Sequence, residues 1–164
     1  MAVRPILRFP DRRLRLAAAP VQEFDDGLRA LAADLADTMA AAQGIGITAP
    51  HIGTALRVVV IALPGSAALT YVNPEIGWQS EDRVRHPEGS VSMPGVTDEV
   101  ERAARVRVGY RSLDGDERAD DADGLLAICL QHEIDQLNGI FWLDRLSRLR
   151  RDRVIKRFEK LSRP

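Results

Sequence analysis

The spacing of apolar residues changes its period along the chain, from one typical of a helix to one typical of strands and back again. Over residues 23–42, apolar side chains recur every three or four positions, which predicts a helix with one buried face. These side chains are Phe24, Leu28, Leu31, Leu35 and Met39. Gly44 follows them and is well placed to end the helix. The first long element predicted is therefore an amphipathic helix packed on a core.

Beyond this helix the apolar residues form short runs rich in β-branched side chains. Residues 57–62 and 69–72 are two such runs. The first run is followed by a turn signal that starts at Pro64 and the second by one that starts at Asn73, so each run predicts a strand. A third run, residues 105–110, alternates polar with apolar or small side chains, and an Asp-Gly pair after it signals a tight turn. We therefore expect a hairpin with a return strand.

Two further helices are predicted in the last third of the chain. Asp123 is a plausible N-cap for a helix that runs to about Asn138, and residues 144–162 predict another. The acidic segment 114–123 indicates a solvated turn and helix entry, because it lacks the spacing of a calcium-binding loop. Strands that alternate with helices would be needed for a parallel doubly wound sheet. The segregated order observed favours an α+β domain with a mostly antiparallel sheet.

Composition limits the chain to one globular domain and excludes some partners. With 164 residues, 45% apolar and 29% charged, residues 1–164 predict a single domain. The 23 Lys and Arg against 24 Asp and Glu leave no broad basic surface for DNA or an anionic membrane. The only cysteine, Cys129, lies in an apolar run, and no stretch predicts a signal peptide or a membrane span. We expect a cytoplasmic protein that binds neither DNA nor membrane.

The most informative segment is residues 130–137, within the second predicted helix. His132 and Gln136 fall one helical turn apart, with Glu133 beside His132. This spacing is that of metallohydrolases in which two histidines at i and i+4 hold a metal and the glutamate activates its bound water. Here Gln136 stands in place of the second histidine. Taken alone, a His-Glu pair on an apolar helix is more often a core histidine beside an acid.

Three segments of the chain resemble the three sequence motifs of one enzyme family, and they occur in the same order as in that family. Residues 44–51 (Gly-Ile-Gly-Ile-Thr-Ala-Pro-His) resemble the glycine-rich first motif of peptide deformylases, which ends in Pro-Gln. Residues 88–92 (Glu-Gly-Ser-Val-Ser) resemble the second, which reads Glu-Gly-Cys-apolar-Ser, and residues 131–137 resemble the third. Residues 5–21 and 122–133 look like the family's opening and its helix. The resemblance covers nearly the whole chain.

The resemblance implies a fold, a reaction and a metal site. The fold would be α+β, with mostly antiparallel sheets around a central helix that carries the His-Glu motif, plus N-terminal and C-terminal helices. The reaction would be removal of the formyl group from the N-terminal methionine of new bacterial proteins, with iron or zinc. In the family, a cysteine at the position of Ser90 and histidines at those of His132 and Gln136 bind the metal. A glutamate at the position of Glu133 shuttles the proton.

The resemblance also implies an oxyanion site and a substrate pocket. A glutamine at the position of His51 and the backbone N–H at Val91 would stabilise the oxyanion formed on the formyl carbon. The pocket positions correspond to Ile45, Gly46, His86, Leu125, Ile128 and Cys129. Four of these residues are equally well explained as ordinary core: Ile45, Leu125, Ile128 and Cys129.

Two departures from the family pattern fall on the metal ligands. Ser90 offers a hydroxyl that stays protonated near pH 7, where a thiolate would bind iron or zinc well. Gln136 offers a neutral amide oxygen, which suits harder cations. Only His132 remains as an expected ligand. We therefore expect no tightly bound cofactor, and any divalent Fe, Zn or Ni would be held weakly through His132.

These observations predict a deformylase-like protein in which ordinary metal-dependent deformylation is lost or strongly impaired. The alternative is an active formyl-amide metallohydrolase with a rebuilt or weak metal site. In that alternative Glu133 is the base, and His51 or His86 joins His132. The expected partners are N-terminal peptide segments of nascent chains. The natural ligand, the oligomeric state and the presence of another deformylase in the same cell stay open.

The end of the chain predicts a second kind of partner. Residues 144–163 hold nine basic side chains against three acidic ones. A solvated helix face is the simplest interpretation of this pattern. In the family the C-terminal helix can dock on the ribosome, so contact with ribosomal RNA phosphates through residues 144–163 is a further expectation.

Overall fold

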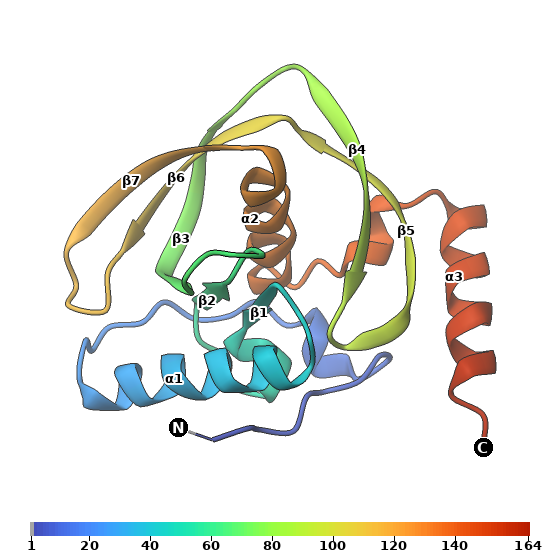
Figure 1. The fold of residues 1–164 in the computed structure, drawn as a ribbon, viewed down its shortest axis with the longest axis horizontal. Helices are drawn as coiled ribbons and strands as arrows, with labels where there is room; N and C mark the ends of the chain where they lie inside the picture. The colour runs from blue at the N-terminus through green and yellow to red at the C-terminus, as the bar shows by residue number, and fades with distance from the viewer. Residues whose placement is uncertain (1) are drawn as a thin grey trace.

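One helix, α2 (Gly124–Leu137), lies at the centre of the molecule and two antiparallel sheets surround it, as Figure 1 shows for the computed structural model, which describes residues 2–164. Helix α1 (Asp26–Ala41) runs along one side, and α3 (Arg148–Leu161) packs on the outside of the β4-β5 sheet. The predicted α+β fold with antiparallel sheets around a central helix is confirmed.

The strands form one five-stranded and one two-stranded sheet. The first has the order β1-β2-β3-β6-β7 and the second pairs β4 with β5. The strands are β1 (Gly46–Thr48), β2 (Val58–Ile61), β3 (Leu69–Gln79), β4 (Arg83–Ser90), β5 (Met93–Ala103), β6 (Arg105–Arg111) and β7 (Glu117–Asp123). The segments outside these elements contain three short 3₁₀ helices: η1 (Arg12–Arg15), η2 (Ala49–Ile52) and η3 (Trp142–Arg145).

The first two predicted helices are present as α1 and α2. The Asp25 carboxylate caps α1 by accepting the Leu28 N–H at 3.0 Å, and the predicted apolar stripe is partly or fully buried. Asp123 is the N-cap residue of α2, although its side chain makes no capping hydrogen bond. After α1, the left-handed residue is Gln43, with φ 56°, and not Gly44.

One predicted strand is longer than expected. Strand β3 was predicted to stop at residue 72, yet it continues through Asn73 and Pro74 to Gln79. The pairing with β6 shifts register between Val72 and Glu75, and Asn73 has φ 51°. Proline has no N–H to donate to the neighbouring strand. The bulge places Pro74 where the ladder does not need that hydrogen bond, so the strand continues past it.

The β4-β5 hairpin was not predicted from the periodicity. Residues 83–87 of β4 are all exposed, so this strand carries no alternation of buried and exposed side chains. The β6-β7 hairpin was predicted, and it forms with pairs from Arg105 and Asp123 to Arg111 and Glu117. Segment 114–123, expected as a turn and helix entry, is largely strand β7 because its backbone completes the ladder of β6.

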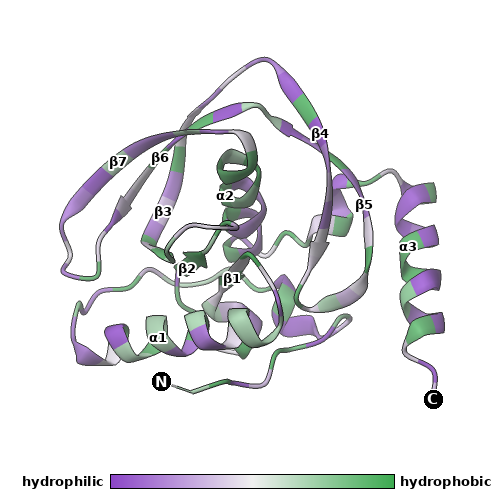
Figure 2. Ribbon diagram, viewed as in Figure 1, coloured by the Kyte–Doolittle hydropathy of each residue, from purple (hydrophilic) through white to green (hydrophobic). Residues whose placement is uncertain are grey.

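The last predicted helix is divided in two. Residues 142–145 form η3, and α3 begins at Arg148 after the N-cap Ser147, whose hydroxyl accepts the Arg150 N–H. Val154 and Phe158 are its buried side chains and pack in a cluster with Phe141. Figure 2 shows this amphipathic character, with hydrophilic colour over much of α3 and apolar turns between. No helix within residues 2–164 is long and apolar enough to cross a bilayer.

Candidate active site

A cavity of about 770 Å³ lies between the start of β1, the β4-β5 hairpin and one face of α2. Of the residues singled out in the sequence, it brings together Ile45, Gly46, His51, His86, Ser90, Val91, Leu125, Ile128, Cys129, His132 and Glu133. Gln136 is the exception, because it does not line this cavity. Segments far apart in sequence therefore meet at one site.

His132 lies between two carboxylates. Its Nδ1 is 2.8 Å from Glu88 Oε1, and its Nε2 is 3.9 Å from Glu133 Oε1. Burial alone would lower the pKa of His132, but the charges of Glu133 and Glu88 outweigh this and raise it. The imidazole is thus fixed by its Nδ1, and only Nε2 faces other groups of the site.

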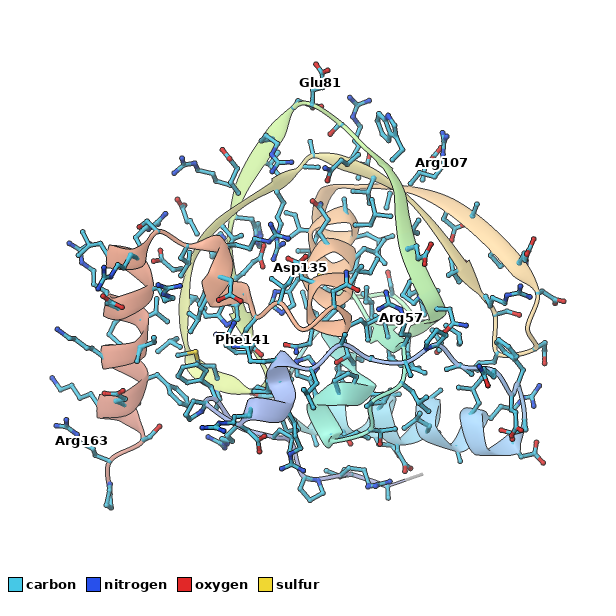
Figure 3. All side chains as sticks on the ribbon, turned by 180° about the vertical axis from the view of Figure 1, so that it is seen from behind. Arg57, Glu81, Arg107, Asp135, Phe141 and Arg163 are labelled. Carbon is cyan, nitrogen blue, oxygen red and sulfur yellow. The ribbon has the colours of Figure 1, made fainter. Side chains whose placement is uncertain are left out.

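A buried network of charges, which the sequence did not predict, supports His132. Arg102 on β5 binds both oxygens of Glu88 at 2.8 Å and reaches Asp135 at 2.6 Å. Asp135, labelled on α2 in Figure 3, also accepts two hydrogen bonds from Arg145. The Arg102 and Glu88 side chains are 4% and 5% exposed. Glu88 and Asp135 lie in segments that resemble family motifs, whereas Arg102 and Arg145 lie outside them.

Glu133 on α2 is buried in the cavity wall, next to Gly46 at the start of β1. Its Oε2 has no hydrogen-bond partner within residues 2–164. Burial raises the pKa of Glu133 to about 7, although the neighbouring His132 lowers it. A carboxyl group with this pKa can accept or donate a proton near neutral pH.

Gly46 leaves the space that Glu133 occupies. A Cβ atom placed on Gly46 would lie 2.6 Å from Glu133 Oε1 and 3.2 Å from its Cγ, which is too close for ordinary contact. We expect Gly46→Ala to lower the free energy of unfolding by about 1–3 kcal/mol, measured by urea denaturation. Gly77→Ala is the matched control, because a Cβ there meets nothing within 4 Å. Equal stability of the two variants would contradict this packing.

His51 has a fixed tautomer. Its Nδ1 accepts the backbone N–H of Thr48 at 2.9 Å, so the neutral ring carries its proton on Nε2. That Nε2 is buried and has no partner within residues 2–164. Burial, with a smaller contribution from His132, lowers the pKa of His51 to about 3. His51 therefore presents a neutral N–H donor in the cavity wall.

His86 and Cys129 lie on opposite walls of the cavity. His86 on β4 is exposed, and its Nδ1 is 2.7 Å from the Pro87 carbonyl oxygen, which leaves Nε2 for another partner. Cys129 on α2 is buried, and burial together with Glu133 and Glu88 raises its thiol pKa to about 12. A thiol with this pKa stays protonated near pH 7.

The side chains at the three positions expected to bind a metal, Ser90, His132 and Gln136, do not suit an iron or zinc ion. Ser90 Oγ accepts the Ser92 N–H at 3.1 Å, and Gln136 Nε2 donates to the Leu14 carbonyl oxygen at 2.7 Å. His132 is the only imidazole left among the three. Residues 2–164 contain no group of three or more His, Cys, Asp or Glu side chains arranged to hold a metal. This donor set is hard and incomplete, where iron and zinc prefer imidazole and thiolate.

Comparison with known proteins identifies the family. The model of the family described as polypeptide deformylase matches residues 3–152. A peptide deformylase-like protein of Brucella suis biovar 1 (strain 1330) is 65% identical over 164 residues, covering 99% of this chain and 100% of the relative. A peptide deformylase of the same strain is 46% identical, covering 99% of this chain and 95% of that protein.

Solved structures agree with this result. The crystal structure of peptide deformylase from Ehrlichia chaffeensis in complex with actinonin matches with a TM-score of 0.94 and 37% sequence identity. The match covers 100% of both chains. The fold, the site geometry and these relatives together show that this chain belongs to the polypeptide deformylase family.

Proposed function

We propose that this protein is a cytoplasmic, deformylase-like binding protein that holds the N-terminal segment of a nascent peptide without ordinary metal-dependent deformylation. The observation that carries the proposal is the contrast within one site. The cavity has an apolar wall, whereas Ser90 and Gln136, which make hydrogen bonds within the protein, offer only neutral oxygens beside His132. A relative named peptide deformylase and one named peptide deformylase-like occur in one strain of Brucella suis. The presence of both proteins in one strain favours a role for the deformylase-like protein that differs from that of the deformylase.

The cavity offers groups that suit an acylated N-terminus. Leu125, Ile128 and Cys129 give it an apolar wall on α2 that can accept an unbranched side chain such as methionine. His51 Nε2–H is a donor and Glu133 Oε2 an acceptor, and neither has a partner within residues 2–164. A formyl amide carries one acceptor oxygen and one N–H, so it can satisfy both.

The alternative is an enzyme with a weak or rebuilt site. The pKa of Glu133 near 7 is suited to a general base, which favours this alternative. His51 is poorly suited to bind a metal through Nε2. Its proton would have to move from Nε2 to Nδ1, and this would break the hydrogen bond that Nδ1 accepts from the Thr48 N–H. His86 keeps its Nε2 available and is the better candidate. Loss of any measured hydrolysis in Glu133→Gln and in His86→Ala would favour this function, and unchanged rates would exclude it.

Peptide binding is tested with a variant that fills the cavity. Leu125→Trp is expected to weaken binding of a formyl-Met-Ala-Ser peptide at least about tenfold in calorimetry, because Leu125 lines the cavity. The neighbouring Leu126 is also half-buried but does not line it, so Leu126→Trp should bind almost as the wild type. Absence of binding to the wild-type chain, or equal affinity of both variants, would contradict the proposal.

Contact between α3 and ribosomal RNA stays a prediction. Arg150 pairs with Asp98 and Arg157 donates to the Thr97 carbonyl, so both hold α3 on β5. Arg148, Arg153 and Lys156 make no ion pair within residues 2–164, which leaves a basic face for phosphates. Co-sedimentation with ribosomes that falls steeply with salt is expected, and absent or salt-insensitive co-sedimentation would refute it.

A further inference from the structure

Gln136 makes a buried contact outside the cavity, one turn of α2 beyond His132. Its side chain is 2% exposed, and its Nε2 donates to the carbonyl oxygen of Leu14 at 2.7 Å. Leu14 belongs to η1 near the start of the chain, 122 residues away in sequence. The hydrogen bond therefore joins the C-terminal half of the central helix to the N-terminal segment.

The Leu14 carbonyl needs such a donor. Carbonyl groups at the end of a helix have no partner inside the helix, and the short η1 ends at Arg15. Leu14 itself is 2% exposed and packs in the cluster that contains Phe141 and Trp142. A buried carbonyl without a donor costs roughly 1–3 kcal/mol, and the Gln136 amide removes this cost.

Two neighbouring contacts show that the N-terminal segment is fitted closely to this end of α2. The Ala18 N–H donates to the Leu137 carbonyl at 2.8 Å. At Gly139, where φ is 78°, a Cβ atom would lie 2.5 Å from the Arg15 carbonyl oxygen, so the two backbones touch. We call the contacts of Leu14, Arg15 and Ala18 with residues 136–139 the N-terminal seam. Gln136 supplies the side-chain hydrogen bond of this seam.

We infer that Gln136 is a structural tie of the N-terminal seam, and that it holds α2 to the N-terminal segment without help from a metal. With its Nε2 donating to Leu14, Gln136 could offer a metal only its neutral Oε1, which is a poor substitute for an imidazole beside Ser90 and His132. The amide nitrogen at the position that would bind a metal in related deformylases is thereby committed to the fold. The inference deepens the proposed function and rests on it only in the claim that the natural protein works without a metal.

Thermal unfolding of the full chain tests the tie. Gln136→Met keeps the size of the side chain but removes the donor, so its melting temperature should fall by roughly 3–10 °C. Gln79→Met is the control, because Gln79 is exposed at the end of β3 and should melt as the wild type does. Limited trypsin digestion at Arg12, Arg13 and Arg15 should also be faster in Gln136→Met. A melting temperature and a digestion rate equal to those of the wild type would overturn the inference.

A chelator tests the metal independence on the wild-type chain alone, even if Gln136→Met does not fold. The melting temperature should stay within about 1 °C on addition of EDTA or of zinc. A fall of several degrees with EDTA would overturn the inference. Failure of the proposed function is distinguishable, because it would appear as absent peptide binding while Gln136→Met still melts below the wild type.

Discussion

Replacing Arg102 with methionine is expected to lower the free energy of unfolding by about 3–5 kcal/mol. The substitution keeps an unbranched apolar stem but removes the cation that binds Glu88 at two points and Asp135 at one. Both carboxylates lie inside the protein, so each would lose its compensating charge. Arg145 would still pair with Asp135, whereas Glu88 would keep only His132.

Urea denaturation measures this loss, and an exposed ion pair supplies the control. Arg105 pairs with Asp82 at 3.2 Å, and both side chains are more than half exposed. Arg105→Met should therefore change the free energy of unfolding by less than about 1 kcal/mol. A similar effect of the two variants would show that the buried network does not hold β4, β5 and α2 together.

The network also sets how stability responds to acid. Burial alone would raise the pKa of Glu88, but hydrogen bonds from Arg102 and His132 lower it from 4.5 to about 2. A carboxyl group whose pKa is lowered by folding stabilises the protein fully above its unfolded pKa. The contribution of Glu88 is therefore complete above about pH 4.5 and is lost as the pH falls toward 2. Arg102→Met should show a weaker dependence on pH in that range.

Restoring both altered positions with Ser90→Cys and Gln136→His is expected to create a metal site. The double variant should bind about one zinc or iron per chain, at least about 100-fold more tightly than the wild type, because two imidazoles and a thiolate replace one imidazole. Since the cavity and Glu133 are already in place, hydrolysis of a formyl-Met-Ala-Ser peptide should appear with the metal. Metal analysis and a formate assay measure the two gains.

Ser90→Cys alone and the metal-free double variant separate the effects of the two substitutions on metal binding and on stability. Ser90→Cys alone should bind metal less tightly than the double variant, because Gln136 remains tied to Leu14. Gln136→His removes that tie, so the metal-free double variant should melt below the wild type and regain stability with zinc. A double variant that binds no metal would mean that residues beyond these two keep the site from assembling.

The architecture was predictable from the sequence because its signals are local or lie in contiguous motifs. The stripe of α1 and the Asp-Gly turn of the β6-β7 hairpin act within a few residues. The family motifs then placed α2 at the centre. The β4-β5 hairpin gave no periodic signal, since residues 83–87 face solvent. Strand β3 is longer than predicted, because a bulge at Asn73 lets the strand continue beyond Pro74.

The candidate site was predictable as a set of residues but not as a set of contacts. The motifs identified several of the side chains that line the cavity, since residues of all three motifs meet there. The partners Arg102 and Asp135 stayed hidden, because a buried ion pair is defined by positions distant in sequence. The direction of Gln136 was equally hidden, since its acceptor Leu14 lies 122 residues away. Helical spacing placed it one turn from His132 but could not show which way its amide points.

The most direct test of the account measures metal content and formyl-peptide turnover of the wild-type chain, purified without oxygen so that iron is not lost to oxidation. We expect well below one equivalent of iron, nickel or zinc, no formate released from formyl-Met-Ala-Ser, and binding of the same peptide. About one equivalent of tightly held metal together with turnover would contradict the account. It would show that His86 or another group completes the site around His132.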